Sequence, residues 1–281
     1  MINILVPTDF SPLSKFALKY AIKIAKALDG TITVLHIITM TKAFRISMRD
    51  KMVSSENAMI ASAEKDLEKL IKTLSEQYKA SQPIHYAVIR GRYFPSTLVR
   101  EARKLHAGLV VMGTRGASGL TKAVMGSNTN SVIAVSQIPV LAVPEKAEFK
   151  GFRNVVYASD LQNLEEELEI LIPYVEKFGS TIHLIHIVPP GNHVDTIEGK
   201  IEAVLRNFHY KNIVTLVLVD EDIDSALDHY VQLSKADVLA MFTHKLSFFE
   251  KVFDRSMTRK MAFHSRVPLL AFRQRSSERG L

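Results

Sequence analysis

Short apolar segments alternate with longer amphipathic segments along the first half of the chain. The short segments are rich in β-branched residues, and they predict strands that are buried on both faces. These predicted strands are Ile4–Val6, Thr31–Ile37, Ile84–Ile89, Leu109–Met112 and Val140–Val143. Between the first two, the pattern predicts a helix over Ser14–Leu28. Ser11 is its expected N-cap, Pro12 fits its first turn, and Gly30 follows its end.

This pattern recurs in the second half of the chain. Four segments return in the same order, as the pairs 3–10 with 154–161, 31–38 with 181–188, 107–112 with 236–241, and 138–143 with 267–272. An ordered recurrence of this kind indicates a duplication. Because strands alternate with helices in each half, we predict two α/β domains, each with a five-stranded parallel sheet flanked by helices. The expected bounds are 1–146 and 151–275, with a break in the pattern at Glu145–Gly151.

The two halves differ between their second and third strands, where the first half has the longer connection. Within it, Asn57–Leu74 shows the spacing of an amphipathic helix. The preceding stretch, Thr41–Lys51, lacks clean periodicity. It is interpreted either as an ordinary long connection or as a flap over a binding site.

Two glycine clusters lie where the pattern passes from the fourth strand to the next helix. Gly113 and Gly116 follow the strand directly, and glycine lets a backbone approach a ligand where a Cβ would collide. Gly126 and Ser127 open the helix, whose free amides and dipole favour a phosphate. Asp9 ends the first strand and is expected to face the same crevice, because ligands of parallel sheets bind beyond the carboxyl ends of the strands.

The spacing Gly113-x2-Gly116-x9-Gly126-Ser127 resembles the ATP-binding signature of universal stress proteins. The segments Ile4–Ser11 and Ile138–Val143 also look like the first and last strands of that family. Taken twice, the resemblance covers nearly the whole chain. It implies Rossmann-like domains of the adenine nucleotide alpha hydrolase-like type. It also implies a stress-response or regulatory protein that binds ATP, alone or with Mg²⁺.

The resemblance further implies roles for individual residues. Asp9, with its neighbours Pro7 and Thr8, would lie near the adenosine, and the backbone after the second strand, around Ile37–Ile38, would meet the edge of the adenine. The residues implied at the ribose and phosphates are Gly113, Arg115, Gly116, Gly126, Ser127, Asn128 and Thr129. Ser127 and Thr129 would add hydroxyl donors, whereas Arg115 would either meet a phosphate or remain solvated.

The second half lacks the glycines of the motif. At the positions of Gly113, Gly116, Gly119 and Gly126 it has Phe242, Lys245, Phe248 and Arg255. We therefore expect nucleotide only in the first domain. The second domain is interpreted either as degenerate, kept for fold and pairing, or as a site for another anion at His244, Lys245 and Arg255. By analogy with Phe242, Gly113→Phe is expected to abolish nucleotide binding while the protein still folds.

The composition narrows the classes of protein to which the chain could belong. With 281 residues, 47% hydrophobic and 23% charged, the chain can bury the cores of two domains. It has no cysteine, which excludes disulfides and thiol nucleophiles and fits a cytoplasmic protein. No apolar run approaches the ~20 residues that span a bilayer. The net charge of +7 is spread along the chain, so nucleic-acid binding is not expected.

Two further groups of polar residues have ordinary structural explanations. His36 and His186 lie at equivalent strand positions without a second ligand nearby in sequence, which favours core or strand-end residues over metal ligands. The acidic run Asp220–Asp224 lacks the glycine and the terminal glutamate of a calcium loop. We interpret it as a solvated loop at a helix N-terminus.

Rival functions remain open beside nucleotide binding. The chain has no Gly-Lys-[Ser/Thr] of a P-loop and no Ser-Gly-Gly-x-Asp-Ser loop of an ATP-dependent ligase. We therefore expect no enzyme, with slow ATP hydrolysis and a nucleotide-independent interaction scaffold as the alternatives. Val140–Val143 and Val267–Phe272 are candidate sheet edges. The family resemblance implies that they pair the two halves as a pseudo-dimer, and a further homodimer is compatible with it.

Overall fold

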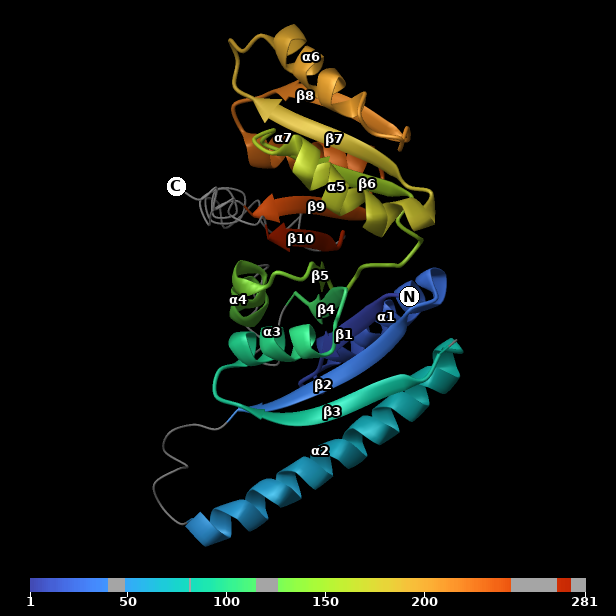
Figure 1. Cartoon of the computed structure of the whole chain (residues 1–281), viewed down its shortest axis with the longest axis vertical. Coiled ribbons are helices and arrows are strands. Elements are labelled where there is room, and N and C mark those ends of the chain that lie inside the picture. Colours follow the sequence, from blue (N-terminus) through green and yellow to red (C-terminus); the bar gives the residue numbers. More distant parts are fainter. Residues whose placement is uncertain (40–48, 81, 115–125, 244–266, 274–281) are drawn as a thin grey trace. The chain divides into compact units, whose positions relative to one another are not determined.

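The computed structural model describes residues 1–39, 49–80, 82–114, 126–243 and 267–273 (Figure 1). The chain folds into two compact units that divide between Glu145 and Lys146. Within the described ranges, no helix is long and apolar enough to cross a membrane.

The first unit has five parallel strands in the order β3-β2-β1-β4-β5. They are β1 (Asn3–Pro7), β2 (Thr31–Thr39), β3 (Ile84–Gly91), β4 (Leu109–Gly113) and β5 (Val140–Val143). Its helices are α1 (Pro12–Leu28), α2 (Arg49–Tyr78), α3 (Phe94–Lys104) and α4 (Ser127–Val135). The predicted parallel α/β fold is therefore confirmed.

The ends of α1 follow the predicted signals, with one difference. The Ser11 Oγ accepts a hydrogen bond from the Ser14 amide at 3.2 Å and caps the start of the helix. At the other end the residue in the left-handed region is Asp29, with φ 50°. A Cβ on Gly30 would lie 2.9 Å from Ile2, so this glycine serves a close contact with the chain beside β1.

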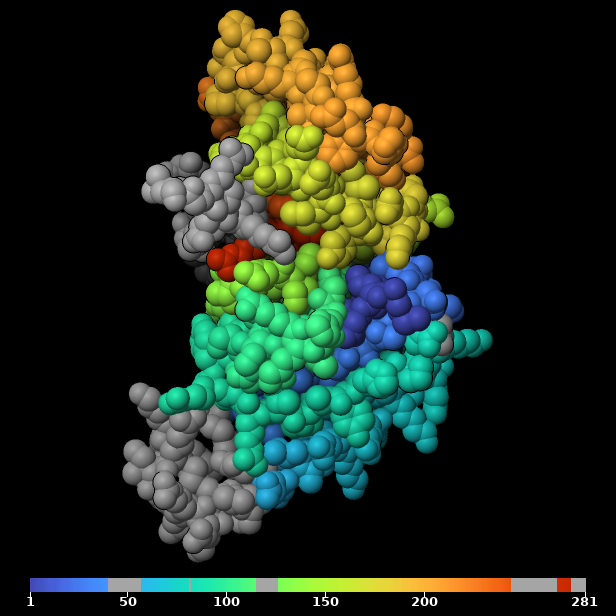
Figure 2. Space-filling view, in the orientation of Figure 1, coloured from blue at the N-terminus to red at the C-terminus, as the bar shows by residue number. Residues whose placement is uncertain are grey.

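Strand β3 corrects the expectation that every strand is buried on both faces. It is the outermost strand of its sheet, and Tyr86 is 37% exposed. Helix α2 runs along β3 in Figure 1 and packs on it through one apolar stripe, in which Ala63, Leu67 and Leu74 are buried. From Asn57 to Tyr78, the other residues of α2 are exposed or half-buried, at the surface of the first unit (Figure 2). A strand at the end of a sheet has a neighbour on only one side, which explains its exposure.

The second unit repeats this arrangement. Its strands run in the order β8-β7-β6-β9-β10, also parallel, which matches the first unit strand for strand. They are β6 (Asn154–Ala158), β7 (Thr181–Val188), β8 (Ile213–Val219), β9 (Val238–Thr243) and β10 (Leu269–Arg273). Its described helices are α5 (Leu164–Val175), α6 (Val194–Leu205) and α7 (Ile223–Leu233), with a 3₁₀ turn at Glu176–Phe178.

The core of the second unit contains a hydrogen-bonded tyrosine where the first unit has Val6. Tyr157, at the repeat position of Val6, is fully buried, and Glu167 is 1% exposed. The Tyr157 hydroxyl donates to the Glu167 carboxylate, and the Ser159 hydroxyl lies 3.4 Å from the same oxygen. Burial, and next the Glu167 carboxylate, raise the pKa of Tyr157 well above its ordinary value. The hydroxyl therefore stays protonated and remains a donor.

Removing this donor is expected to destabilise the second unit. Tyr157→Phe leaves a carboxylate oxygen in the core without its main partner, at a cost of about 2 kcal/mol. Urea denaturation measures the change in the free energy of unfolding, with the exposed Tyr93→Phe as the matched control. Equal stability of the two variants would contradict the proposed importance of this hydrogen bond.

Candidate functional site

A tight turn ends β1 and places Asp9 at the carboxyl edge of the sheet. Thr8 is buried, and its amide donates to the Leu35 carbonyl at 2.9 Å. Phe10 then adopts a left-handed conformation with φ 62°. The Asp9 Oδ1 accepts from the Ser11 amide at 3.1 Å, which holds the turn that leads into α1. Asp9 is exposed at the end of the strand.

His36 ties β2 to the end of β1. Its Nδ1 lies 2.8 Å from the Thr8 carbonyl, and its ring centroid is 4.8 Å from that of Phe10. Because a carbonyl only accepts, Nδ1 carries the proton. This is the structural role expected for a strand-end histidine. Among the described residues, no group of three or more histidine or acidic side chains could hold a metal ion. Phe10 was not among the site residues predicted from the sequence.

Ile37 and Ile38 lie inside β2, which corrects their expected position after it. Both side chains are buried. Alternate residues of a strand turn their backbone groups to opposite neighbours, and Leu35 accepts from Thr8 on the β1 side. The backbone of Ile37 therefore also faces β1, whereas that of Ile38 faces β3.

Gly113 ends β4, and its role differs from the predicted approach to a ligand. A Cβ there would lie 2.6 Å from Leu13 Cγ and 3.3 Å from the Leu13 carbonyl oxygen. The missing side chain therefore lets α1 pack closely on β4. The expectation that Gly113→Phe leaves folding intact stays a prediction, and the contact with Leu13 argues against it, because a phenyl ring would overlap the first turn of α1.

The start of α4 presents backbone donors. Its N-cap, Gly126, makes no side-chain capping hydrogen bond, and its own amide donates to the Thr114 carbonyl at 2.5 Å. The amides of the first helical turn have no partner within the helix. Ser127 and Asn128 are exposed beside them. The first turn of α4 thus lies where the sequence predicts amide donors for a phosphate.

Thr129 takes a different role from the predicted one. It is 2% exposed, and its hydroxyl donates to the Gly113 carbonyl at 2.8 Å. This single hydroxyl proton is used to fasten α4 to β4, so the prediction of a free hydroxyl donor is wrong.

The described elements meet at one edge of the sheet. Strand β1 pairs with β2 on one side and with β4 on the other, and the next strands continue outward from these two. The strand order therefore reverses between β1 and β4, where parallel α/β sheets have their crevice. The sheet brings together Asp9, the end of β2 and the start of α4. Several predicted residues lie outside the described ranges, namely residues 41–48, Arg115, Gly116, Gly119, His244, Lys245, Phe248 and Arg255. Arg49–Lys51, the end of the predicted irregular stretch, lie within α2.

Two arginines that the sequence analysis missed lie at the end of β3. Arg90 and Arg92 are exposed, and the Arg90 guanidinium donates to Asn57 Oδ1 of α2 at 3.0 Å. Arg90 pairs in register with Ile38, so this positive charge adjoins the carboxyl edge of β2. Their position at the end of a predicted strand could have marked them as site residues, because the carboxyl ends of parallel strands lie at one edge of the sheet.

Comparison with known proteins fits this geometry. The family model of the universal stress protein family matches residues 1–144. The chain belongs to the universal stress protein family. A universal stress protein of Methanocaldococcus jannaschii is 30% identical over 142 residues, which is 50% of this chain and 81% of that protein. Universal stress protein A homolog 1 of Coxiella burnetii is 29% identical over 150 residues, 50% of this chain and 94% of that protein.

Solved structures show the same fold over both units. A universal stress protein from Archaeoglobus fulgidus superposes with a TM-score of 0.69 at 19% identity, covering 98% of this chain and 97% of the other. A functionally unknown protein from Pseudomonas aeruginosa PAO1 gives 0.62 at 17% identity, covering 96% and 92%. The second unit therefore shares the universal stress protein fold.

The second unit differs from the first at the position of Gly113. Phe242 stands there, buried, with its ring stacked on Phe272 at 4.7 Å between centroids and edge-on to Tyr157 at 5.8 Å. The close helix-to-strand contact of the first unit is thus replaced by aromatic packing.

The contact between Gly113 and Leu13 is testable by a double-mutant cycle. Gly113→Ala is expected to lower the free energy of unfolding by about 1–3 kcal/mol, because the new methyl group overlaps Leu13. In the Leu13→Ala background the same change should cost much less. Thermal and urea unfolding of the four proteins measure the coupling, and additive effects would show that the two residues do not interact.

Proposed function

We propose that the first unit binds ATP, alone or with Mg²⁺, in the crevice at the carboxyl ends of β1, β2 and β4, and that the protein is a regulatory stress-response protein. The observation that carries this proposal is the start of α4 at the reversal of strand order, where the backbone amides of Ser127 and Asn128 lie in the first helical turn.

Electrostatics supports an anionic ligand. The N-terminus of α4 carries the positive end of the helix dipole and has no acidic residue in its first turn. Arg90 and Arg92 add positive charge at the end of β3. We also propose that Gly116 and Arg115 lie at the phosphates, as the family resemblance implies. A triphosphate carries several negative charges and is therefore attracted to this edge more strongly than a neutral ligand is.

The same crevice offers contacts for a nucleoside. We propose that the exposed Asp9 carboxylate, which accepts from the Ser11 amide, also accepts from a ribose hydroxyl. The backbone of Ile37 supplies the polar edge on the β2 side, and the neighbouring buried isoleucines supply an apolar surface. We assign Pro7 and Thr8 to supporting Asp9, because the groups of Thr8 bond within the protein.

We further propose that ATP binds only to the first unit and is not a substrate of rapid catalysis. In the second unit the glycines of the motif are replaced, with Lys245 and Arg255 at the positions of Gly116 and Gly126. In the first unit Asp9 is the acid at the crevice, and we place it near the adenosine rather than near the γ-phosphate. Slow hydrolysis is the alternative, and a phosphate-release assay over hours distinguishes it from binding alone.

A charge change at the start of α4 tests the phosphate site. Ser127→Asp should weaken ATP binding at least tenfold through repulsion, while the new acid stabilises the helix N-terminus and preserves folding. Calorimetric titration of ATP–Mg²⁺ measures the affinity, and thermal unfolding checks the fold. The matched control is Thr196→Asp, which adds the same charge to an exposed position in the first turn of α6.

The same titration decides between the remaining functions. We expect one ATP per chain in the unaltered protein and in Thr196→Asp. Unchanged affinity in Ser127→Asp would overturn the phosphate site, and two ATP molecules per chain would overturn the assignment to one unit. No binding, together with no nucleotide extracted by acid from the purified protein, would favour the nucleotide-independent scaffold.

A further inference from the structure

Strand β8 is the outermost strand of the second unit, and within the described ranges it is paired on one side only. The Asn212 carbonyl accepts from the Ile182 amide at 2.8 Å, and the Asp220 amide donates to β7 at 2.9 Å. The even-numbered residues therefore turn their backbone groups to β7. The backbone groups of the odd-numbered residues point outward, and an edge of this kind is a template for another strand.

The usual protection of an edge strand is missing from β8. Natural edge strands commonly carry a charge, a proline or a bulge that hinders pairing with another chain. The seven residues Ile213–Val219 include no charged residue and no proline, and their register with β7 is uninterrupted. The equivalent strand of the first unit, β3, has Arg90 within it. The sequence of β8 thus leaves its outer edge open to pairing.

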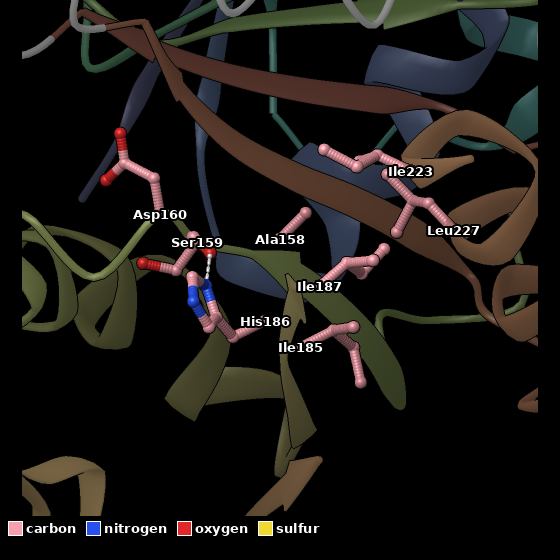
Figure 3. A pocket seen from close by; sticks show the side chains of 8 residues that line it. All are labelled: Ala158, Ser159, Asp160, Ile185, His186, Ile187, Ile223 and Leu227. Atoms are coloured by element: carbon pink, nitrogen blue, oxygen red, sulfur yellow. Dashed lines mark hydrogen bonds between the residues drawn. The ribbon is translucent and has the colours of Figure 1, made fainter. Parts of the chain in front are cut away.

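One face of β8 also carries an apolar stripe. Helix α7 packs on the neighbouring strand β7, where Ile223 and Leu227 line a small pocket together with Ile185 and Ile187 (Figure 3). Register places Leu216 and Leu218 beside those two β7 residues, with Val214 next along the same face. Val214 is 49% exposed, and both leucines are half-buried. These three residues leave apolar surface at the outer edge of the sheet.

Helix α6 packs on β8 from the opposite face. The connection through α6 moves outward along the sheet and the one through α7 moves back, so right-handed crossovers place the two helices on opposite faces. Val217 points to the α6 face and is buried. The stripe of Val214, Leu216 and Leu218 therefore lies on the face away from α6.

Charges of opposite sign flank the strand. Arg206 and Lys211 precede it, and the carboxylates that follow it are Asp220, Glu221, Asp222 and Asp224. The basic residues His244, Lys245 and Arg255 follow β9 in sequence, and β6 and β7 lie between that strand and β8. An antiparallel copy of β8 would bring a basic flank to an acidic flank at both ends. A parallel copy would instead place like charges side by side, which is unfavourable.

One antiparallel register uses every outward backbone group of the strand. With a two-fold axis at Leu216, Ile213 lies opposite Val219, and Thr215 lies opposite Val217. All four turn their backbone groups outward, as the hydrogen-bonded pairs of an antiparallel ladder require. Moving the axis by one residue along the strand would leave part of β8 unpaired.

The same register matches the side chains. Val214 lies opposite Leu218, and Leu216 lies opposite its own copy, at the non-hydrogen-bonded positions where side chains approach most closely. Lys211 lies opposite Glu221, and both are exposed. The Lys211 ammonium donates to the Phe208 carbonyl at 2.8 Å, which uses one of its three protons.

From this self-complementarity we propose that two copies of the chain associate through β8, paired antiparallel about a two-fold axis at Leu216. The partner is a second copy because one strand supplies both halves of each match: outward backbone groups, an apolar stripe centred on the axis, and flanks of opposite charge. The proposal does not depend on ATP binding by the first unit, and its tests are made without nucleotide.

Sedimentation equilibrium of the full-length chain measures the association. We expect the mass to rise to twice that of one chain, with a dissociation constant on the order of 10–100 μM, because an interface between two strands is small. Added salt should weaken the dimer, since its ion pairs are exposed. A single-chain mass at concentrations roughly ten times higher than this constant would overturn the proposal.

A pair of charge reversals tests the contact between Lys211 and Glu221. Lys211→Glu alone and Glu221→Lys alone each place like charges opposite one another at both ends, and each should weaken self-association about tenfold. An equal mixture of the two variants should associate as the unaltered chain does, because both ends are again complementary. The matched control reverses the exposed Lys72 and Glu76 of α2 in the same way and should leave association unchanged. No recovery on mixing would contradict the register.

Single cysteines test the position of the axis, because the chain has none of its own. Leu216→Cys faces its own copy at a Cα separation of about 4.5 Å, which a disulfide spans, and should form a covalent dimer under mild oxidation. Val214→Cys is the control, because it is on the same face and more exposed but lies opposite Leu218 rather than its own copy. Thermal unfolding checks the fold of both. Equal crosslinking of the two variants, or none in Leu216→Cys, would overturn the antiparallel pairing.

Discussion

Both units depend on the hydrogen bonds that end their central strand. In the first, the Thr8 amide donates to Leu35, its carbonyl accepts from His36, and its Oγ1 accepts from the Phe10 amide at 3.1 Å. In the second, Ser159 makes the same three contacts, with Ile185, His186 and Leu161. The residue that follows the acid is left-handed in both, with φ 62° and 63°. This turn fixes where the acid lies and where the next helix begins.

On this shared turn the two units carry different residues at equivalent positions. The first has a glycine where α1 meets β4 and arginines at the end of β3. The second has Phe242 stacked on Phe272 and carboxylates at the end of β8. Core packing and surface charge therefore differ between the two units.

Much of the fold could be predicted because it rests on local pattern. Buried parallel strands are short and apolar, and the Ser11–Pro12 pair marked the start of α1 through a contact three residues away. The candidate site was harder to predict in detail. Gly113 was expected to approach a ligand, but it packs against Leu13, one hundred residues earlier in the chain. The Thr129 hydroxyl was expected to face a ligand, but it donates a hydrogen bond to the carbonyl of Gly113 in β4. Local sequence patterns do not predict contacts between residues so far apart in the chain.

The duplication, the alternation of strands and helices, and the spacing of glycines that resembles the universal stress protein signature are all evident along the chain. These are properties of neighbouring residues and of fixed intervals along one chain. The three-dimensional fold was needed to show that Gly113 serves packing, that the Thr129 hydroxyl is already bonded, and that Arg92 and Glu221 occupy matching positions at the ends of β3 and β8. The physical reason is that strand order and register bring distant residues together, and burial then decides which of their polar groups are already paired.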